Sequence, residues 1–359
     1  MTVHLDRLSL PEAQGGPLGP LKPRSARTVP RPTTRQLLQA LQALVTAALV
    51  VIGCYLVARN WSDVMQSLRQ LSPLYWVPAL ASALAAMGCA TKSWQVLFDG
   101  LGSPLGVRRA SPIFLVGQLG KYVPGSVWTY VLQADLGRRV GVSRARVLKA
   151  TLAASLIAVV AALMTSVLAV PGIINQSPDL RMLLWLYALL PVCAVALHPR
   201  VLRAIVGLGM RVLRKPNPLP LLQARTVMFA FAWASLSYAL FGTHLWLLVL
   251  SNPGTSVVDL AQCTGTIATA MIAGVFVLIL PSGLGVRELV IYAGLLPIVG
   301  SAPALALAAV SRAVLTVGDL AIAATSAAWG WRILRKESIP AGTAHPRAAS
   351  QPLPRAAFK

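Results

Sequence analysis

The sequence predicts an all-α, polytopic integral membrane protein with about six full transmembrane helices and two re-entrant, broken-helix hairpins inserted from opposite faces. Of its 359 residues, 56% are hydrophobic and only 12% are charged, whereas a soluble domain carries roughly 25% charged residues. Apolar runs close to the ~20 residues that a bilayer crossing requires recur along the chain. Two further apolar runs are interrupted by glycine, proline and charge, and these predict the hairpins.

Six uninterrupted runs have the length of a full crossing. They cover residues 37–58, 74–98, 150–170, 182–198, 226–250 and 303–329. We therefore expect one transmembrane domain at 37–330. The flanking segment 1–36 is rich in proline, glycine and arginine without apolar periodicity, and the short segment 331–359 is rich in proline, alanine and arginine, so we expect both to be disordered tails.

The basic residues are distributed unevenly between the connecting segments. Of 32 Lys and Arg residues, 26 lie in segments 1–36, 99–149, 199–225 and 330–359. By the positive-inside rule, these segments and both termini are expected to be cytoplasmic, in a multi-pass protein of the plasma membrane. A formal charge of +22 would suggest nucleic acid in a soluble chain. Here no clustered aromatic residues accompany the charge, so we expect no nucleic-acid partner.

The first interrupted run, residues 112–132, contains Gly-Gln-Leu-Gly-Lys-Tyr-Val-Pro-Gly-Ser-Val-Trp at 117–128. Basic sequence flanks it on both sides, so it is expected to enter the membrane and return to the same face. Broken backbone at membrane depth is tolerated only where protein or a wet cavity satisfies its polar groups. Lys121 within it indicates a functional site.

The second interrupted run, residues 263–299, contains Pro-Ser-Gly-Leu-Gly-Val-Arg-Glu at 281–288. It starts on the outer side, and too few residues follow the break for a crossing. Two such hairpins from opposite faces are typical of inverted-repeat transporters. The glycines permit close backbone approach, and a helix starting after each break would present free N–H groups to an anion.

Two further charges lie near mid-bilayer in the last predicted crossing. Arg312 and Asp319 are seven residues apart, and therefore two turns apart on one helix face. They could line one interior surface. A purely structural pair, Arg312–Asp319 or Arg312–Glu288, is the alternative. Together with Lys121 and Arg287 they predict a pocket of net positive character, suited to a phosphate-bearing headgroup.

Both motifs, the basic segment 136–143 and the late Ser311-Arg312 resemble the transmembrane (flippase) domain of lysylphosphatidylglycerol synthase/flippase proteins. The resemblance implies a lipid-translocating domain without an enzymatic role. The family's soluble aminoacyl-transfer domain has no counterpart in the short tail after Trp331, so lysyl transfer is not expected. The candidate substrate-binding residues are Lys121, Tyr122, Pro124, Gly125, Pro281, Gly283, Gly285, Arg287, Glu288, Arg312 and Asp319.

The predicted function is translocation of a phosphate-bearing polar lipid through a central polar cavity. One alternative is a non-catalytic membrane partner of a lipid or glycan synthase. A lipid-headgroup transferase is less favoured, because only Glu288 and Asp319 are acidic at depth and no acidic metal-binding cluster occurs. Expected partners are a membrane phospholipid or other polar lipid, the bilayer, and either a second copy of the chain or a synthase. Scattered Cys and His residues predict no metal and no cofactor.

Overall fold

The structure is a computed structural model that describes residues 65, 73–102, 104–123, 127–176, 187–212, 220–252, 254–276 and 283–337. The predicted crossing 37–58 and the tail 1–36 lie outside these residues. The last helix continues to Glu337, past residue 330, where the transmembrane domain was expected to end.

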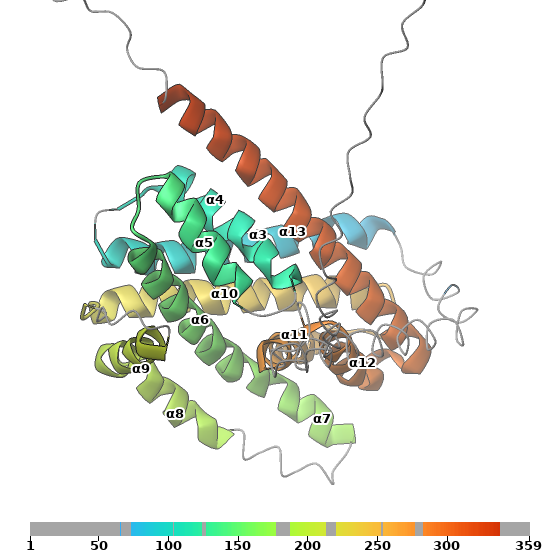
Figure 1. Cartoon of the computed structure of the whole chain (residues 1–359). Coiled ribbons are helices and arrows are strands. Elements are labelled where there is room, and N and C mark those ends of the chain that lie inside the picture. Colours follow the sequence, from blue (N-terminus) through green and yellow to red (C-terminus); the bar gives the residue numbers. More distant parts are fainter. Residues whose placement is uncertain are drawn as a thin grey trace, which may run out of the picture. The chain divides into compact units, whose positions relative to one another are not determined.

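Every regular element in the described residues is a helix, as predicted (Figure 1). The helices are α3 Pro73–Gly100, α4 Val107–Gly117, α5 Trp128–Arg139, α6 Arg144–Ser166, α7 Val170–Gln176, α8 Leu189–Ala196, α9 Pro199–Val212, α10 Ala224–Val249, α11 Asp259–Phe276, α12 Val286–Val299 and α13 Ser301–Glu337, with 3-10 helices η1 Gln118–Tyr122 and η2 Val167–Ala169.

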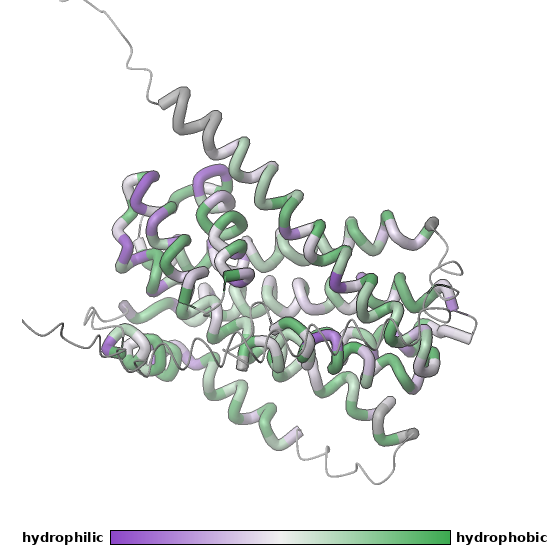
Figure 2. Tube along the Cα trace, turned by 45° about the vertical axis from the view of Figure 1, so that its right-hand side comes forward, coloured by the Kyte–Doolittle hydropathy of each residue, from purple (hydrophilic) through white to green (hydrophobic). Residues whose placement is uncertain are grey.

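Four helices in the described part of the chain are long and apolar enough to cross a membrane. They comprise Leu74–Gly100, Arg144–Gly172, Ala224–Val249 and Ser301–Gly330, which confirms four of the predicted crossings as long apolar helices. Figure 2 shows hydrophobic residues along most of their length, with isolated hydrophilic positions between them. The protein is therefore a multi-pass membrane protein.

The predicted crossing 182–198 has a different form. Its described part holds α8, of only 8 residues, and the chain then bends by 80° into α9. The pair would count as a fifth span only if the two helices are taken together. The basic segment 199–225 is expected to be a cytoplasmic connection, but Leu202, Val206 and Met210 recur every fourth residue and are buried. Their spacing is that of an amphipathic helix, and α9 is one.

An antiparallel pair, α3 and α10, forms the centre of the bundle. Ser93 donates a hydrogen bond to the carbonyl of Ala230, and Ser237 donates one to the carbonyl of Ala86. Further along the same interface, the hydroxyl of Ser82 donates to the carbonyl of Leu240. Such hydroxyl-to-backbone bonds fix the register of apolar helices that have no hydrophobic driving force for association in lipid.

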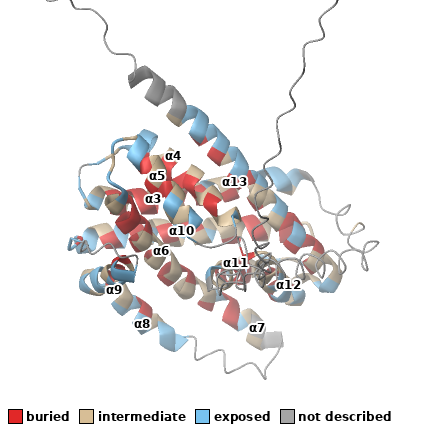
Figure 3. Ribbon diagram, viewed as in Figure 1, coloured by how far each residue is buried: buried red, intermediate tan, exposed pale blue. Residues whose placement is uncertain are grey.

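Both interrupted runs form two helices joined by a break, as predicted. The first comprises α4, η1 and α5, and the second comprises α11 and α12. Their helices extend over 107–139 and 259–299, and so begin before the predicted hairpins at 112 and 263. Helix α13 packs against α3, α4, η1 and α12, so it touches both broken segments. Figure 3 shows that buried residues gather where these helices meet, whereas much of α8 and α9 is exposed.

Candidate functional site

The first break separates α4 from α5 and positions Lys121. Helix α4 gives way to a 3-10 turn at Gln118, and the backbone then becomes extended at Val123. Gly120 lies against the start of α5, where an added Cβ would be 2.5 Å from the backbone nitrogen of Thr129. Only glycine allows this approach. Of the candidate residues in this segment, Pro124 and Gly125 lie outside the described residues.

The second break positions Arg287 at the start of α12. Gly283 and Gly285 have positive φ angles of 65° and 84°, which turn the chain into the helix. The Gly285 N–H donates a hydrogen bond to Glu288 Oε2 at 2.6 Å. The start of this helix, expected to present free N–H groups to an anion, therefore already has a carboxylate at its cap. Pro281 lies outside the described residues.

Helix α13 is tied to both breaks by charged side chains. Lys121 Nζ lies 2.5 Å from Asp319 Oδ2, and the Tyr122 hydroxyl donates to the same oxygen at 2.6 Å. Two turns earlier on α13, Arg312 Nε lies 3.2 Å from Glu288 Oε1. Of the two pairs considered for Arg312, the Glu288 pair is therefore formed, and Asp319 is paired with Lys121.

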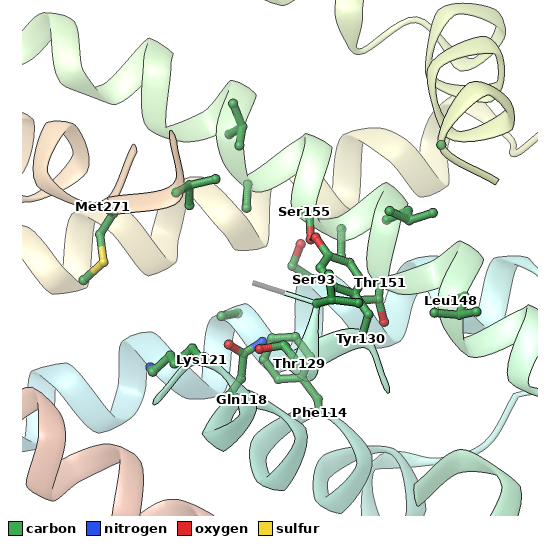
Figure 4. A pocket seen from close by; sticks show the side chains of 18 of the residues that line it. Ser93, Phe114, Gln118, Lys121, Thr129, Tyr130, Leu148, Thr151, Ser155 and Met271 are labelled. Atoms are coloured by element: carbon green, nitrogen blue, oxygen red, sulfur yellow. The ribbon is translucent and has the colours of Figure 1, made fainter. Parts of the chain in front are cut away.

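A cavity of about 1160 Å³ lies between the two breaks. Its walls come from α3, α4, η1, α5, α6, α9, α10, α11 and α12. Three of the predicted site residues line it: Lys121, Gly283 and Arg287. Figure 4 shows the side chain of Lys121 from η1 among the lining side chains. Lys121 and Arg287, from segments far apart in the sequence, thus face one cavity.

The other described candidates lie behind this wall. Tyr122, Gly285, Glu288, Arg312 and Asp319 are not among the residues that line the cavity. They bind instead to one another and to Lys121. Direct substrate contact by these five residues stays a prediction.

Arg287 differs from Lys121 in its surroundings. Its Nε lies where a Cβ at Gly274 would be 2.3 Å away and one at Gly283 would be 3.1 Å away, so the side chain runs over two bare glycines. This Nε is buried without a hydrogen-bond partner, and no carboxylate of the described residues forms an ion pair with Arg287. A buried cationic donor without a partner is energetically unfavourable, so the site favours an anion beside it.

A group of hydroxyl residues in the cavity wall was not predicted. Ser93, Tyr130, Thr151 and Ser155 line the cavity and gather together in Figure 4. Tyr130 donates to Ser155 Oγ at 3.1 Å, and Thr151 donates to Gln133 at 2.5 Å. Hydroxyl residues inside apolar runs were the available signal, but such residues also serve helix packing.

The cavity is edged by exposed apolar side chains from two helices. Val127 and Val131, at the start of α5, are 56% and 49% exposed, and Leu208 and Val212 of α9 are 62% and 75% exposed. All four line the cavity. An exposed apolar edge of this kind is compatible with contact to acyl chains.

The family described as Lysylphosphatidylglycerol synthase TM region matches residues 39–323. The chain belongs to this family. The match includes both broken segments and Asp319, and it confirms the resemblance found in the sequence motifs. Membership of this family indicates a lipid-related function in the membrane. A comparison with curated proteins finds no matching relative. Among the described residues, no three His, Cys, Asp or Glu side chains are grouped to hold a metal ion.

Proposed function

We propose that the protein is a lipid flippase or transporter that moves a phosphate-bearing polar lipid between the leaflets without changing it covalently. The observation that carries this proposal is one cavity in which two cations from separate broken helices, Lys121 and Arg287, meet an edge of exposed apolar residues. This combination matches the two parts of a phospholipid.

The charges support a phosphate as the recognised group. Four charged residues line the cavity: Lys121, Asp135, Arg144 and Arg287. Asp135 and Arg144 are paired with each other at 3.3 Å, and Lys121 is paired with Asp319. Arg287 alone among them has no carboxylate partner in the described residues, so it is the proposed primary contact. A guanidinium binds phosphate oxygens through two parallel N–H donors.

The edge of the cavity supports a lipid rather than a free anion. Exposed apolar residues of α5 and α9 border the opening, so acyl chains can remain in the hydrocarbon while the headgroup enters. The two breaks would expose the cavity alternately, as in transporters whose broken helices meet at the midplane. We therefore propose re-entrant hairpins for both broken segments and the plasma membrane as the location.

The test is translocation of a fluorescent phosphatidylglycerol in liposomes that contain the purified protein. We expect faster exchange between leaflets than in protein-free liposomes. Arg287→Gln should slow it about tenfold or more, because one charge-assisted contact is lost. Arg287→Lys should retain part of the rate. Arg225→Gln is the matched control, since this exposed arginine stacks on Phe229 and does not line the cavity.

Two outcomes would contradict the proposal. One is exchange no faster than in protein-free liposomes, and the other is equal loss in Arg287→Gln and Arg225→Gln. Exchange that appears only when a synthase is added would instead favour the non-catalytic partner function.

A further inference from the structure

A second hollow lies outside the central cavity, between α4, α5 and the end of α13. Its volume is about 470 Å³, and it shares no lining residue with the central cavity. It therefore has to be explained separately from the proposed transport path.

Three arginines surround this hollow. Arg108 and Arg109 come from the start of α4, and Arg139 comes from the end of α5. All three are exposed, and Arg139 is in addition paired with Asp135, its Nε lying 3.2 Å from Oδ2. The Arg108 Cζ lies 5.9 Å from the centre of the Trp329 ring, which holds an aromatic side chain at the same edge. Tryptophan and arginine at one level are typical of the headgroup region of a bilayer.

The walls below the rim are apolar. They include Ile113 and Val116 of α4, Leu136 of α5, and Ala327 and Ala328 of α13. The two alanines are exposed and leave room where larger side chains would fill the space. A hollow with an apolar floor and a cationic rim is complementary to a phosphate attached to a hydrocarbon chain, rather than to a fully hydrated ion.

We infer that this hollow binds the phosphate headgroup of an anionic phospholipid from the leaflet on the basic side of the protein. The headgroup lies between Arg108, Arg109 and Arg139, and one acyl chain lies along the alanine face of α13. Bound lipid at this place would join the first broken segment to α13. It is a site separate from the transport path and does not depend on the proposed function.

The test uses a phosphatidylglycerol that carries a photoreactive group next to its headgroup, added to the full-length protein in detergent micelles. Mass spectrometry of the digested protein then locates the label. We expect labelled peptides from the start of α4 and from the end of α13. Unlabelled phosphatidylglycerol should compete, whereas phosphatidylcholine and inorganic phosphate should not.

Variants distinguish the site from general attraction to a basic surface. Arg108→Gln together with Arg109→Gln should weaken labelling here about fivefold for each arginine removed. Ala328→Phe keeps every charge but fills the hollow, and should reduce labelling to a similar extent. Arg203→Gln, which removes an exposed arginine of α9, is the control and should change labelling less than about twofold.

Three results would overturn the inference. They are labelling spread evenly over all basic segments, an equal loss in Arg203→Gln, and displacement of the lipid by inorganic phosphate. Because the label is located by peptide, labelling of the central cavity is read separately and bears only on the proposed function.

Discussion

Each broken segment has a turn between helices and a cation beside the central cavity, and the two segments differ in how the turn is made and in what the cation is paired with. In the first, Gly120 brings η1 against the start of α5, and the cation Lys121 is neutralised by Asp319 of α13. In the second, Gly283 and Gly285 turn the chain with positive φ. There the carboxylate of Glu288 is used by the cap and by Arg312, and Arg287 is left without a carboxylate in the described residues.

This difference gives Lys121 a structural partner and, under the proposed function, leaves Arg287 as the binding cation. Both Lys121 and Arg287 touch the central cavity, so their position alone would assign them the same role. Their partners, however, indicate different roles. The Lys121 pair joins the first segment to α13, whereas Arg287 has a buried Nε with no acceptor. We therefore expect mutations in the first segment to change stability most, and mutations of Arg287 to change transport most.

The largest expected effect on stability is that of Gly120→Ala. The new Cβ would lie 2.5 Å from the Thr129 nitrogen and 2.7 Å from the Trp128 carbonyl carbon. Backbone atoms cannot move aside as a side chain end can, so we expect a loss of about 3 kcal/mol or more. Gly88→Ala is the control, because that helical position has open space around it. Thermal unfolding in detergent measures both, and equal midpoints would contradict the tight closure of the first break.

The next effect is that of Lys121→Gln, which leaves the Asp319 carboxylate without its cation. Breaking a buried pair costs roughly 3–5 kcal/mol. Because the Lys121 side chain is 26% exposed, water compensates in part, and we expect about 2 kcal/mol. Lys121→Gln combined with Asp319→Asn should recover most of this loss. Arg287→Gln should leave the unfolding midpoint unchanged or higher. If it destabilises the protein as much as Lys121→Gln does, the distinction between the two cations is wrong.

The smallest effect concerns acid at the basic end of the first segment. Hydrogen bonds from Arg139 and Arg144 hold the pKa of Asp135 below its usual value. A carboxyl with a lowered folded pKa stabilises the fold above its unfolded pKa, and this contribution is lost as pH falls through the folded value. The window therefore lies below about pH 4.

Hydrogen exchange measures this loosening at the end of α5. We expect faster exchange there in acid, and no such acid dependence in Asp135→Asn. High salt should reduce the effect, since the carboxylate is partly exposed to solvent. Helix α8 contains no acidic or basic residue, so it serves as the internal control. Equal acid loosening in α8 would contradict this assignment.

The sequence predicted the membrane helices and both breaks for physical reasons that are local. A long apolar run needs a helix in hydrocarbon, and glycine with proline interrupts it. Helices α3 and α10 therefore lie close to their expected bounds, and α13 begins close to its expected start but continues further at its C-terminal end. Helix α9 was missed because arginines lie between its apolar positions, and these basic residues indicated a cytoplasmic connecting segment. The predicted crossing 182–198 was the shortest of the six, and its described helix, α8, bends by 80° into α9.

Of the candidate residues, the structure places Lys121, Gly283 and Arg287 at one cavity, and their part in binding stays a prediction. The Arg312–Glu288 pair was one of two alternatives for Arg312, whereas the Lys121–Asp319 pair was not anticipated. Heptad spacing placed Arg312 and Asp319 on one face of α13. Which acid pairs with which base depends on how segments far apart in the sequence, such as those of Lys121 and Asp319, approach each other in the fold, and no local pattern contains this. The cluster of hydroxyl-bearing residues Ser93, Tyr130 and Thr151 was missed for the same reason, because its members come from three different helices.

Helix α13 has a consequence for how the protein can move. Arg312 and Asp319 stand two turns apart on one continuous rod, and each holds the tip of a different broken segment. A slide of this rod by one turn, about 5.4 Å, would pull both tips from their partners in the same step. Opening toward one leaflet and closing toward the other would then be a single event, with one helix serving as the shared lever.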